Sequence, residues 1–327
     1  MTDQLLSPSF LYTLDRLALV SRRARAGTFK GERRSPRRGG SVEFADFREY
    51  APGDDFRQID WNAYARLERL FLRLFLEEED ATVHVILDAS PSMDWGEPPK
   101  WPYAQRVAAA LGYVALVGMD RLVGGAVGAR LPSPSGTPGG RAGGEGLSLA
   151  SRHGEGSNGA GLTLFPPHRG KKQALAWFEW LAALSPKGGK AAEASSPEQA
   201  LARYAANVRR PGPLVLVGDL LDDGWRAGVS RLAERRYELT LLHVLSPQEA
   251  APELEGDLKL VDSETEADVE ITADFDLLAR YRMRVAEWQA DWGQFCAARA
   301  IAYVPIQTSL PFEDLVLAVL RRQGIIK

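Results

Sequence analysis

From residue 80 onward, short apolar runs alternate with longer stretches in which apolar residues recur every three or four positions. The short runs have the character of strands buried on both faces, and they cover residues 83–87, 122–127, 214–217, 239–244 and 301–306. Helical periodicity fills the intervals between them, over residues 103–119, 171–184, 197–208, 225–236 and 275–299. This alternation predicts an α/β fold in which helices cover both faces of a doubly wound, mostly parallel sheet.

The alternation of predicted strands and helices is interrupted once, at residues 132–161, which are rich in Gly, Ser and Pro and contain few bulky apolar residues. Such a composition predicts a flexible insertion. Its flanks, residues 126–131 and 162–165, are apolar enough to pair as a hairpin. We therefore expect an antiparallel strand at one edge of the sheet, a common addition to parallel sheets.

The first 79 residues follow a different pattern. Apolar residues spaced by three and four predict a helix over 9–26, and a basic loop rich in Gly, Ser and Pro follows at 27–40. Alternation predicts a short strand within 41–50, whereas residues 62–75 fit a helix or an extended segment equally well. We thus expect an N-terminal helical and extended region over 1–79, followed by the α/β domain over 80–327.

Cysteine content and hydropathy indicate the compartment. Cys296 is the single cysteine, which excludes a disulfide framework within the chain and a cysteine zinc site. Nothing approaches the run of about 18 apolar residues that spans a bilayer, and the N-terminus lacks the features of a secretory signal. These features predict a cytoplasmic protein that does not span a membrane.

Charge is distributed unevenly along the chain. The formal net charge is −3, yet residues 16–38 hold nine Lys or Arg against the single acid Glu32. A basic arm of this kind attracts nucleic acid or an anionic membrane. It lacks interleaved aromatic residues and any recognisable nucleic-acid fold, so docking onto acidic protein residues is the simpler interpretation. Nucleic-acid binding stays open as a minor hypothesis.

The loop after the first predicted strand carries the most distinctive chemistry. It reads Asp88-Ala-Ser90-Pro-Ser92-Met93, so a carboxylate and two hydroxyls stand at alternate positions and can point to the same side. In open α/β sheets ligands bind beside such loops. An all-oxygen set suits Mg²⁺ or Mn²⁺, which keeps waters and leaves a position open to an external ligand.

A second acid follows a later apolar strand, because Leu214-Val-Leu-Val-Gly ends at Asp219. Parallel strands end at one edge of a sheet, so we expect Asp219 to lie near Asp88. For Asp88 alone, capping of the following turn is the alternative interpretation.

The sequence offers little for nucleophilic catalysis. The histidines are His84 and His243 within predicted strands and His153 and His168 near the insertion. Ser90 and Ser92 do not occupy a Gly-x-Ser-x-Gly elbow. We therefore expect a binding protein rather than an enzyme, with a metal-dependent phosphate or ester hydrolase as the alternative.

Beyond these features, the sequence resembles the domain-of-unknown-function 58 family, whose members are similar to von Willebrand factor A domains and often accompany MoxR-type AAA+ ATPases. The resemblance covers nearly the whole chain. It is carried by Glu43-Phe44, Arg48-Glu-Tyr50, Pro52-Gly-Asp54-Asp55, Arg57-Gln-Ile-Asp60-Trp61, Ala65-Arg66, Asp88-Ala-Ser90-Pro-Ser92-Met93 and Val261-Asp262-Ser-Glu-Thr.

The resemblance implies a metal-ion-dependent adhesion site, in which Mg²⁺ or Mn²⁺ bridges this chain to an acidic side chain of a partner. Asp88, Ser90 and Ser92 match the Asp-x-Ser-x-Ser positions, and Asp219 resembles the later acid. A threonine ligand of the family is absent here, and Ser195 or Ser196 stands in its region. The implied partners are a MoxR-type ATPase and a client protein, in chaperone-like assembly or maturation.

The acidic and aromatic segment from Asp54 to Trp61 has two interpretations. Its charges either pair within the chain as a clasp between the N-terminal region and the α/β domain, or they form part of a partner surface. The residues alone favour pairing.

Overall fold

The computed structural model describes residues 5–17, 19, 43–51, 54, 56, 59–76, 81–129, 157–158, 161–186, 196–208, 210–261 and 268–327. The chain divides into two compact units, one formed by residues 1–21 with 81–327 and the other by residues 22–80. We call them the sheet unit and the hairpin unit. The basic residues 22–38 lie outside the described residues, as does the predicted insertion at 132–161 except for residues 157, 158 and 161.

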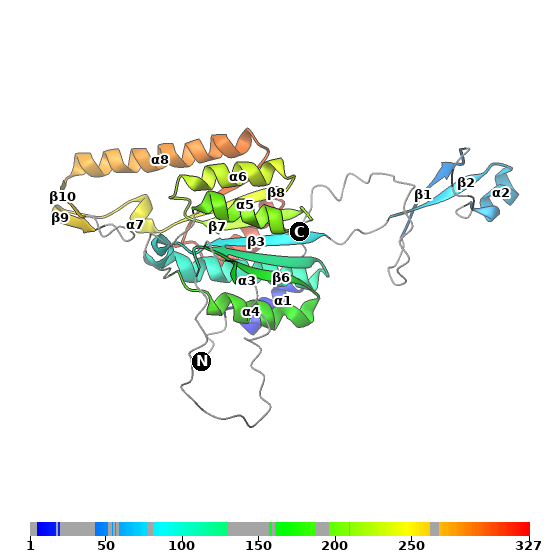
Figure 1. Cartoon of the computed structure of the whole chain (residues 1–327), viewed down its shortest axis with the longest axis horizontal. Helices are drawn as coiled ribbons and strands as arrows, with labels where there is room; N and C mark the ends of the chain where they lie inside the picture. Colours follow the sequence, from blue (N-terminus) through cyan, green and yellow to red (C-terminus); the bar gives the residue numbers. More distant parts are fainter. Residues whose placement is uncertain are drawn as a thin grey trace, which may run out of the picture. The chain divides into compact units, whose positions relative to one another are not determined.

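A seven-stranded sheet forms the centre of the sheet unit (Figure 1). Its spatial order is β11 (Ala302–Gln307), β8 (Glu238–Leu245), β7 (Pro213–Gly218), β3 (Thr82–Asp88), β4 (Arg121–Val127), β6 (Leu162–Arg169) and β5 (Ser157–Asn158). The strands from β11 to β4 run parallel, whereas β6 lies antiparallel to both β4 and β5. The mostly parallel sheet and the antiparallel edge predicted from the sequence are confirmed.

Helices cover both faces of this sheet, which explains the continuous apolar runs of its strands. Every residue of β3 is buried, and so are all but the first residues of β7 and β8. A strand covered on both sides has no solvent face, so its sequence does not alternate. Branched Val and Ile suit this pleated, buried setting.

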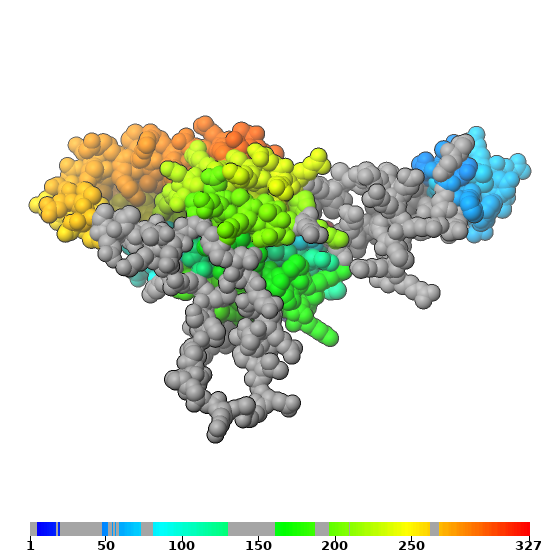
Figure 2. Space-filling model, viewed as in Figure 1, coloured from blue at the N-terminus to red at the C-terminus, as the bar shows by residue number. Residues whose placement is uncertain are grey.

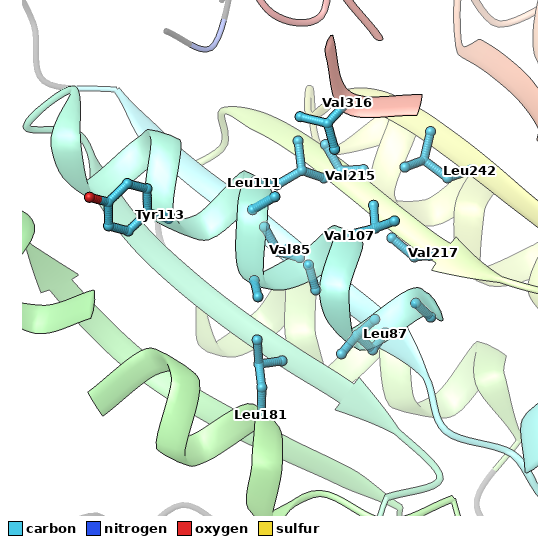
Figure 3. Close-up of a cluster of buried hydrophobic side chains, with 14 of the residues drawn as sticks. Val85, Leu87, Val107, Leu111, Tyr113, Leu181, Val215, Val217, Leu242 and Val316 are labelled. Atoms are coloured by element: carbon cyan, nitrogen blue, oxygen red, sulfur yellow. The ribbon is translucent and has the colours of Figure 1, made fainter. Parts of the chain in front are cut away.

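Each face has its own helices and its own core. One face packs against α1 (Pro8–Leu14), α3 (Lys100–Val117), α4 (Ala174–Ala183) and the C-terminal segment α9 (Phe312–Asp314), η8 (Leu315–Val319) and α10 (Leu320–Arg322). Figure 3 shows this core, where Val85 and Val215 from the sheet meet Leu111 of α3. The other face packs against α5 (Pro197–Asn207), α6 (Gly224–Glu234) and α8 (Phe275–Ala297). Short turns complete the unit: η3 (Pro91–Asp94), η6 (Lys171–Gln173) and α7 (Pro247–Ala250).

The N-terminal helix belongs to the sheet unit, so residues 1–21 were wrongly assigned to the N-terminal region, whereas the boundary expected after residue 79 agrees with the division at Asp80. The helix ends at Leu14 rather than continuing to residue 26, and Phe10, Leu14 and Leu17 are buried in the core of the sheet unit. A hydrogen bond of 2.7 Å from the Tyr113 hydroxyl to Asp15 fixes it further. Burial of these apolar side chains therefore separates residues 1–21 from the rest of the predicted N-terminal region.

The hairpin unit contains β1 (Glu43–Glu49), α2 (Trp61–Leu67) and β2 (Phe71–Leu76), with β1 and β2 antiparallel. Residues 62–75, left open between helix and strand, contain both. The Asp60 carboxylate caps α2 by accepting bonds from the amides of Asn62 and Ala63, and Asp54 pairs with Arg48 at 2.7 Å. Asp54 and Asp60 are thus paired within their own unit, whereas Asp55 and Arg57 lie outside the described residues.

One further element was not predicted. Strands β9 (Gly256–Val261) and β10 (Asp268–Ala273) form an antiparallel hairpin beside the start of α8, the gold and orange part of Figure 2. Its strands are largely exposed. Within the described part of the chain, no helix has the length and apolar character needed to cross a membrane.

Candidate cation site at the carboxyl edge of the sheet

The sheet brings its two strand-end acids to neighbouring positions. Asp88 is the last residue of β3, and Asp219 directly follows β7, the parallel neighbour of β3. From β3 the chain continues to β4 on one side of the sheet and returns later to β7 on the other. The direction of winding therefore reverses between β3 and β7, and open α/β sheets bind ligands at such a point.

The Asp88 carboxylate is buried, with a relative exposure of 1%, and only one of its oxygens is used. Oδ1 accepts a hydrogen bond of 3.0 Å from the Ser90 amide, which fixes the turn after β3. Oδ2 is buried, and no residue in the described part of the chain gives it a hydrogen bond. Buried polar atoms in native proteins nearly always have a partner, so this oxygen, the one carboxylate oxygen among the five such atoms of the described residues, makes Asp88 a candidate ligand-binding residue.

The two serine hydroxyls of the loop lie together, with the Ser90 and Ser92 Oγ atoms 2.9 Å apart. The extended backbone of Ser90 precedes η3, which begins at Pro91. Alternate positions therefore project toward the same side, as the Asp-x-Ser-x-Ser spacing predicts. Each hydroxyl retains an acceptor lone pair for a metal ion.

Gly218 allows Asp88 to occupy this position. A Cβ atom at Gly218 would lie 2.4 Å from the Asp88 Cβ and 2.9 Å from its Oδ2. Such contacts are too short for any side chain other than hydrogen. The glycine before Asp219 is thus part of the site, because the backbone of β7 must pass directly beside the Asp88 carboxylate.

The Asp88 carboxylate lies in an environment that disfavours its charged form. Burial, together with the charge of Asp219, raises the pKa of the Asp88 carboxyl well above its usual range, although the bonds from Ser90 oppose the shift. Desolvation penalises the charged form, and a second carboxylate adds repulsion. A cation beside Oδ2 would relieve both effects.

Asp219 has a different environment, because both of its oxygens have partners. Oδ2 accepts a bond of 2.7 Å from the Lys100 ammonium, and Oδ1 accepts one of 3.3 Å from the Leu221 amide. Lys100 is fully buried and also pairs with Glu249 of α7. Burial lowers the pKa of Lys100, but the two carboxylates outweigh this and raise it above its ordinary value.

The serines proposed in place of a threonine ligand are not brought into this cluster by any described contact. Ser196 is the N-cap of α5, where its hydroxyl accepts a bond of 3.4 Å from the Gln199 amide. This local role accounts for a serine before a proline at a helix start. Ser195 lies outside the described residues.

Sequence reasoning missed Lys100 and Glu249. Lys100 begins a helix whose next positions are mostly apolar and buried. A charged residue next to such a buried helix could have indicated a buried ion pair. Glu249 completes the capping box of α7, with its side chain accepting from the Ser246 amide. That motif is readable from the sequence, but the second use of Glu249, as a partner of Lys100, is not.

The buried histidines are bonded into the core. His84 Nδ1 lies 2.8 Å from the Tyr204 hydroxyl, and His243 Nδ1 lies 2.6 Å from that of Tyr303. Burial lowers their pKa values, to about 3 for His84 and about 4 for His243. Both are therefore neutral side chains at physiological pH.

The donor set fits a hard divalent cation only if other ligands complete the shell. No group of three or more His, Cys, Asp or Glu side chains in the described part of the chain is arranged to hold a metal. What is available is one free carboxylate oxygen and two hydroxyls, with Asp219 as a neighbouring charge. Mg²⁺ accepts such a set because it retains waters, and the remaining positions stay open.

A family model with the description "Protein of unknown function DUF58" matches residues 46–137 and 149–291. The chain belongs to the DUF58 family. Uncharacterized proteins from Mycobacterium bovis and Mycobacterium tuberculosis are each 25% identical to this DUF58 chain over 288 residues, which cover 87% of it and 80% of each relative.

Two solved structures are also similar to this DUF58 chain. The hypothetical protein BatB from Bacteroides thetaiotaomicron has a TM-score of 0.42 at 11% identity. An aerotolerance-related membrane protein from Bacteroides fragilis has a TM-score of 0.41 at 14% identity. Each comparison covers 75% of this chain and 98% of the other.

Proposed function

We propose that this DUF58 protein is a metal-dependent protein–protein interaction module. Asp88, Ser90 and Ser92 bind Mg²⁺ or Mn²⁺, and a carboxylate of a partner protein completes the coordination shell. The observation that carries the proposal is the buried Asp88 Oδ2, which accepts no hydrogen bond from the described residues and lies at the reversal point of the sheet, at the start of the loop that carries the two paired serine hydroxyls. A bound cation would supply the missing partner and displace any proton on the carboxyl.

The surroundings of the loop support binding of a protein rather than of a small metabolite. Trp95 follows η3 and is 49% exposed, and Leu221 follows Asp219 and is 52% exposed. Large apolar side chains at the rim of a polar centre are typical of protein interfaces. We propose that they contact the partner around the cation.

The resemblance to von Willebrand factor A domains supplies the class of partner. We propose a von Willebrand factor A-like arrangement for the sheet unit, a MoxR-type AAA+ ATPase as one partner and a client protein as the other, acting in chaperone-like assembly or maturation. We propose a binding role without catalysis, in which His84 and His243 are core residues bonded to tyrosines.

The test is affinity capture from native lysate of the source cells with Mg²⁺ or with a chelator. We expect the wild-type protein to retain a MoxR-type ATPase only with Mg²⁺ and the Asp88→Asn variant to lose it. Asp223→Asn is the matched control, because Asp223 is an exposed acid near the same edge without a capping bond. Equal capture in chelator, or by Asp88→Asn, would refute the bridging cation.

A further inference from the structure

Lys100 is a charged side chain that neither the Asp-x-Ser-x-Ser loop nor the family match assigns to the site. Its ammonium is fully buried between Asp219, which follows β7, and Glu249 of α7. An unpaired buried ammonium would be strongly destabilising. The two carboxylates therefore explain how Lys100 is tolerated, but not why a charged group is there.

Helix formation does not account for a lysine at this position. Lys100 is the first residue of α3, and its N-cap, Pro99, makes no side-chain capping bond. The N-terminus of a helix carries partial positive charge, which disfavours a cation. The explanation must lie in the cluster that Lys100 contacts.

The charges of the cluster suggest what Lys100 does. Asp88, Asp219 and Glu249 supply three carboxylates, and Lys100 supplies one ammonium, which leaves a formal charge of −2 when all are ionised. A divalent cation would neutralise the cluster. Without Lys100 the same cation would be left with an excess negative charge around it, which repels a further carboxylate.

We propose that Lys100 acts as a counter-charge of the cation site. Its ammonium neutralises part of the negative charge of Asp219 and Glu249. A divalent ion bound by the Asp-x-Ser-x-Ser loop therefore keeps its attraction for an external carboxylate. This inference rests on the proposed function and adds a positioning residue to it. Lys100 makes cation binding weaker than the acids alone would allow, and makes carboxylate binding stronger.

Hydrogen bonds of Glu249 and its neighbour hold the turn that contacts Lys100 in place. Its second oxygen accepts a bond of 2.8 Å from the Ser246 amide, and its backbone carbonyl accepts one of 2.9 Å from the Tyr281 hydroxyl of α8. Gln248 exchanges two bonds of 3.0 Å with the backbone of Glu97. The turn that holds Lys100 is therefore tied both to the loop after Ser92 and to α8.

Two variants with opposite expected effects test the inference. Lys100→Met removes the counter-charge and is expected to bind Mn²⁺ about tenfold more tightly, given the size of charge interactions near a protein surface. Glu249→Gln releases the charge of Lys100 and is expected to weaken Mn²⁺ binding by a similar factor. Glutamine also completes a capping box, so this second variant keeps α7 and is informative even if Lys100→Met does not fold.

The measurements are Mn²⁺ affinity, from the spectroscopic signal of free Mn²⁺, and relaxation of acetate protons by protein-bound Mn²⁺. We expect acetate relaxation to fall in Lys100→Met and to be retained in Lys100→Arg. Lys171→Met is the control, since Lys171 pairs with Asp15 on the surface of the same unit.

The outcomes separate the inference from the function on which it rests. If the wild-type protein binds Mn²⁺ but neither variant shifts affinity in the expected direction, Lys100 is only a structural ion pair and the inference is wrong. If the wild-type protein binds no Mn²⁺, the proposed function fails, and the inference falls with it.

Discussion

Asp88 and Asp219 end adjacent parallel strands after similar apolar runs, and each is 1% exposed, yet their surroundings differ. Asp219 has a partner for each oxygen, one of them an ammonium. Asp88 has one oxygen bonded to its own loop and one that has no partner among the residues that the structure describes. Similar apolar strands thus lead to one acid that is neutralised within the protein and one with a buried oxygen that accepts no hydrogen bond from the described residues.

The difference arises from residues distant in the chain. Lys100, which neutralises Asp219, is 119 positions away from it, and Glu249 approaches from a further turn. Burial alone therefore does not distinguish a structural acid from a binding acid. The partners of each oxygen do.

The largest expected effect is the contrast in stability between the two acids. Asp219→Asn leaves Lys100 with a single carboxylate in a buried site and should lower the free energy of unfolding by about 3 kcal/mol. Asp88→Asn should change it by less than about 1 kcal/mol or raise it, because it removes the charge of a desolvated acid whose only described hydrogen bond comes from its own loop. Urea unfolding of both variants in chelator measures this, and equal losses would show that the acids are equivalent.

A second variant tests the close approach of the two strands. Gly218→Ala places a methyl group 2.4 Å from the Asp88 Cβ, so we expect a loss of about 2 kcal/mol from overpacking. At Gly293 in α8 the corresponding Cβ would meet only Tyr303, at 3.8 Å. Gly293→Ala should therefore be neutral or stabilising. A harmless Gly218→Ala would mean that Asp88 is not confined by β7.

A smaller effect concerns His84, a buried group of β3 that, unlike Asp88, has partners for both ring nitrogens. Burial lowers its pKa to about 3, whereas the unfolded chain takes up the proton near pH 6.5. Its contribution to stability is therefore complete above pH 6.5 and is lost as the pH falls toward 3.

The expected slope from His84 approaches about 1.4 kcal/mol per pH unit between about pH 5.5 and about pH 4, where the histidine is protonated in the unfolded chain but not in the folded protein. Urea unfolding between pH 4.5 and 7.5 should show a shallower slope for His84→Gln than for the wild-type protein, with parallel behaviour above pH 7. An unchanged slope would indicate that His84 is not the buried neutral group described here.

Much of the fold was predictable because both faces of the sheet are covered. The apolar runs of β3, β4, β7 and β8 follow from burial, and the ends of β3 and β7 placed Asp88 and Asp219 at one edge. The helix α1 was predicted too long, since Leu17 continues the apolar spacing although it packs beyond the helix end. The β9–β10 hairpin was missed although Leu258 and Leu260 alternate with polar residues.

The site was only partly predictable. Ser90 and Ser92 follow from local spacing, whereas the pairing of Lys100 with Asp219 and Glu249 depends on tertiary contacts that no local pattern encodes. Ser196 is the opposite case. The resemblance implies that Ser196 is a metal ligand, whereas the structure gives it a local role as the N-cap of α5.

The most direct test of the cation site is the free energy of unfolding with and without Mg²⁺. A ligand that binds only the folded protein, at one hundred times its dissociation constant, adds about 2.7 kcal/mol. We expect a gain of this order in the wild-type protein and in Asp223→Asn, and no gain in Asp88→Asn. A wild-type protein that Mg²⁺ does not stabilise, or an Asp88→Asn variant stabilised equally, would contradict a cation bound at Asp88.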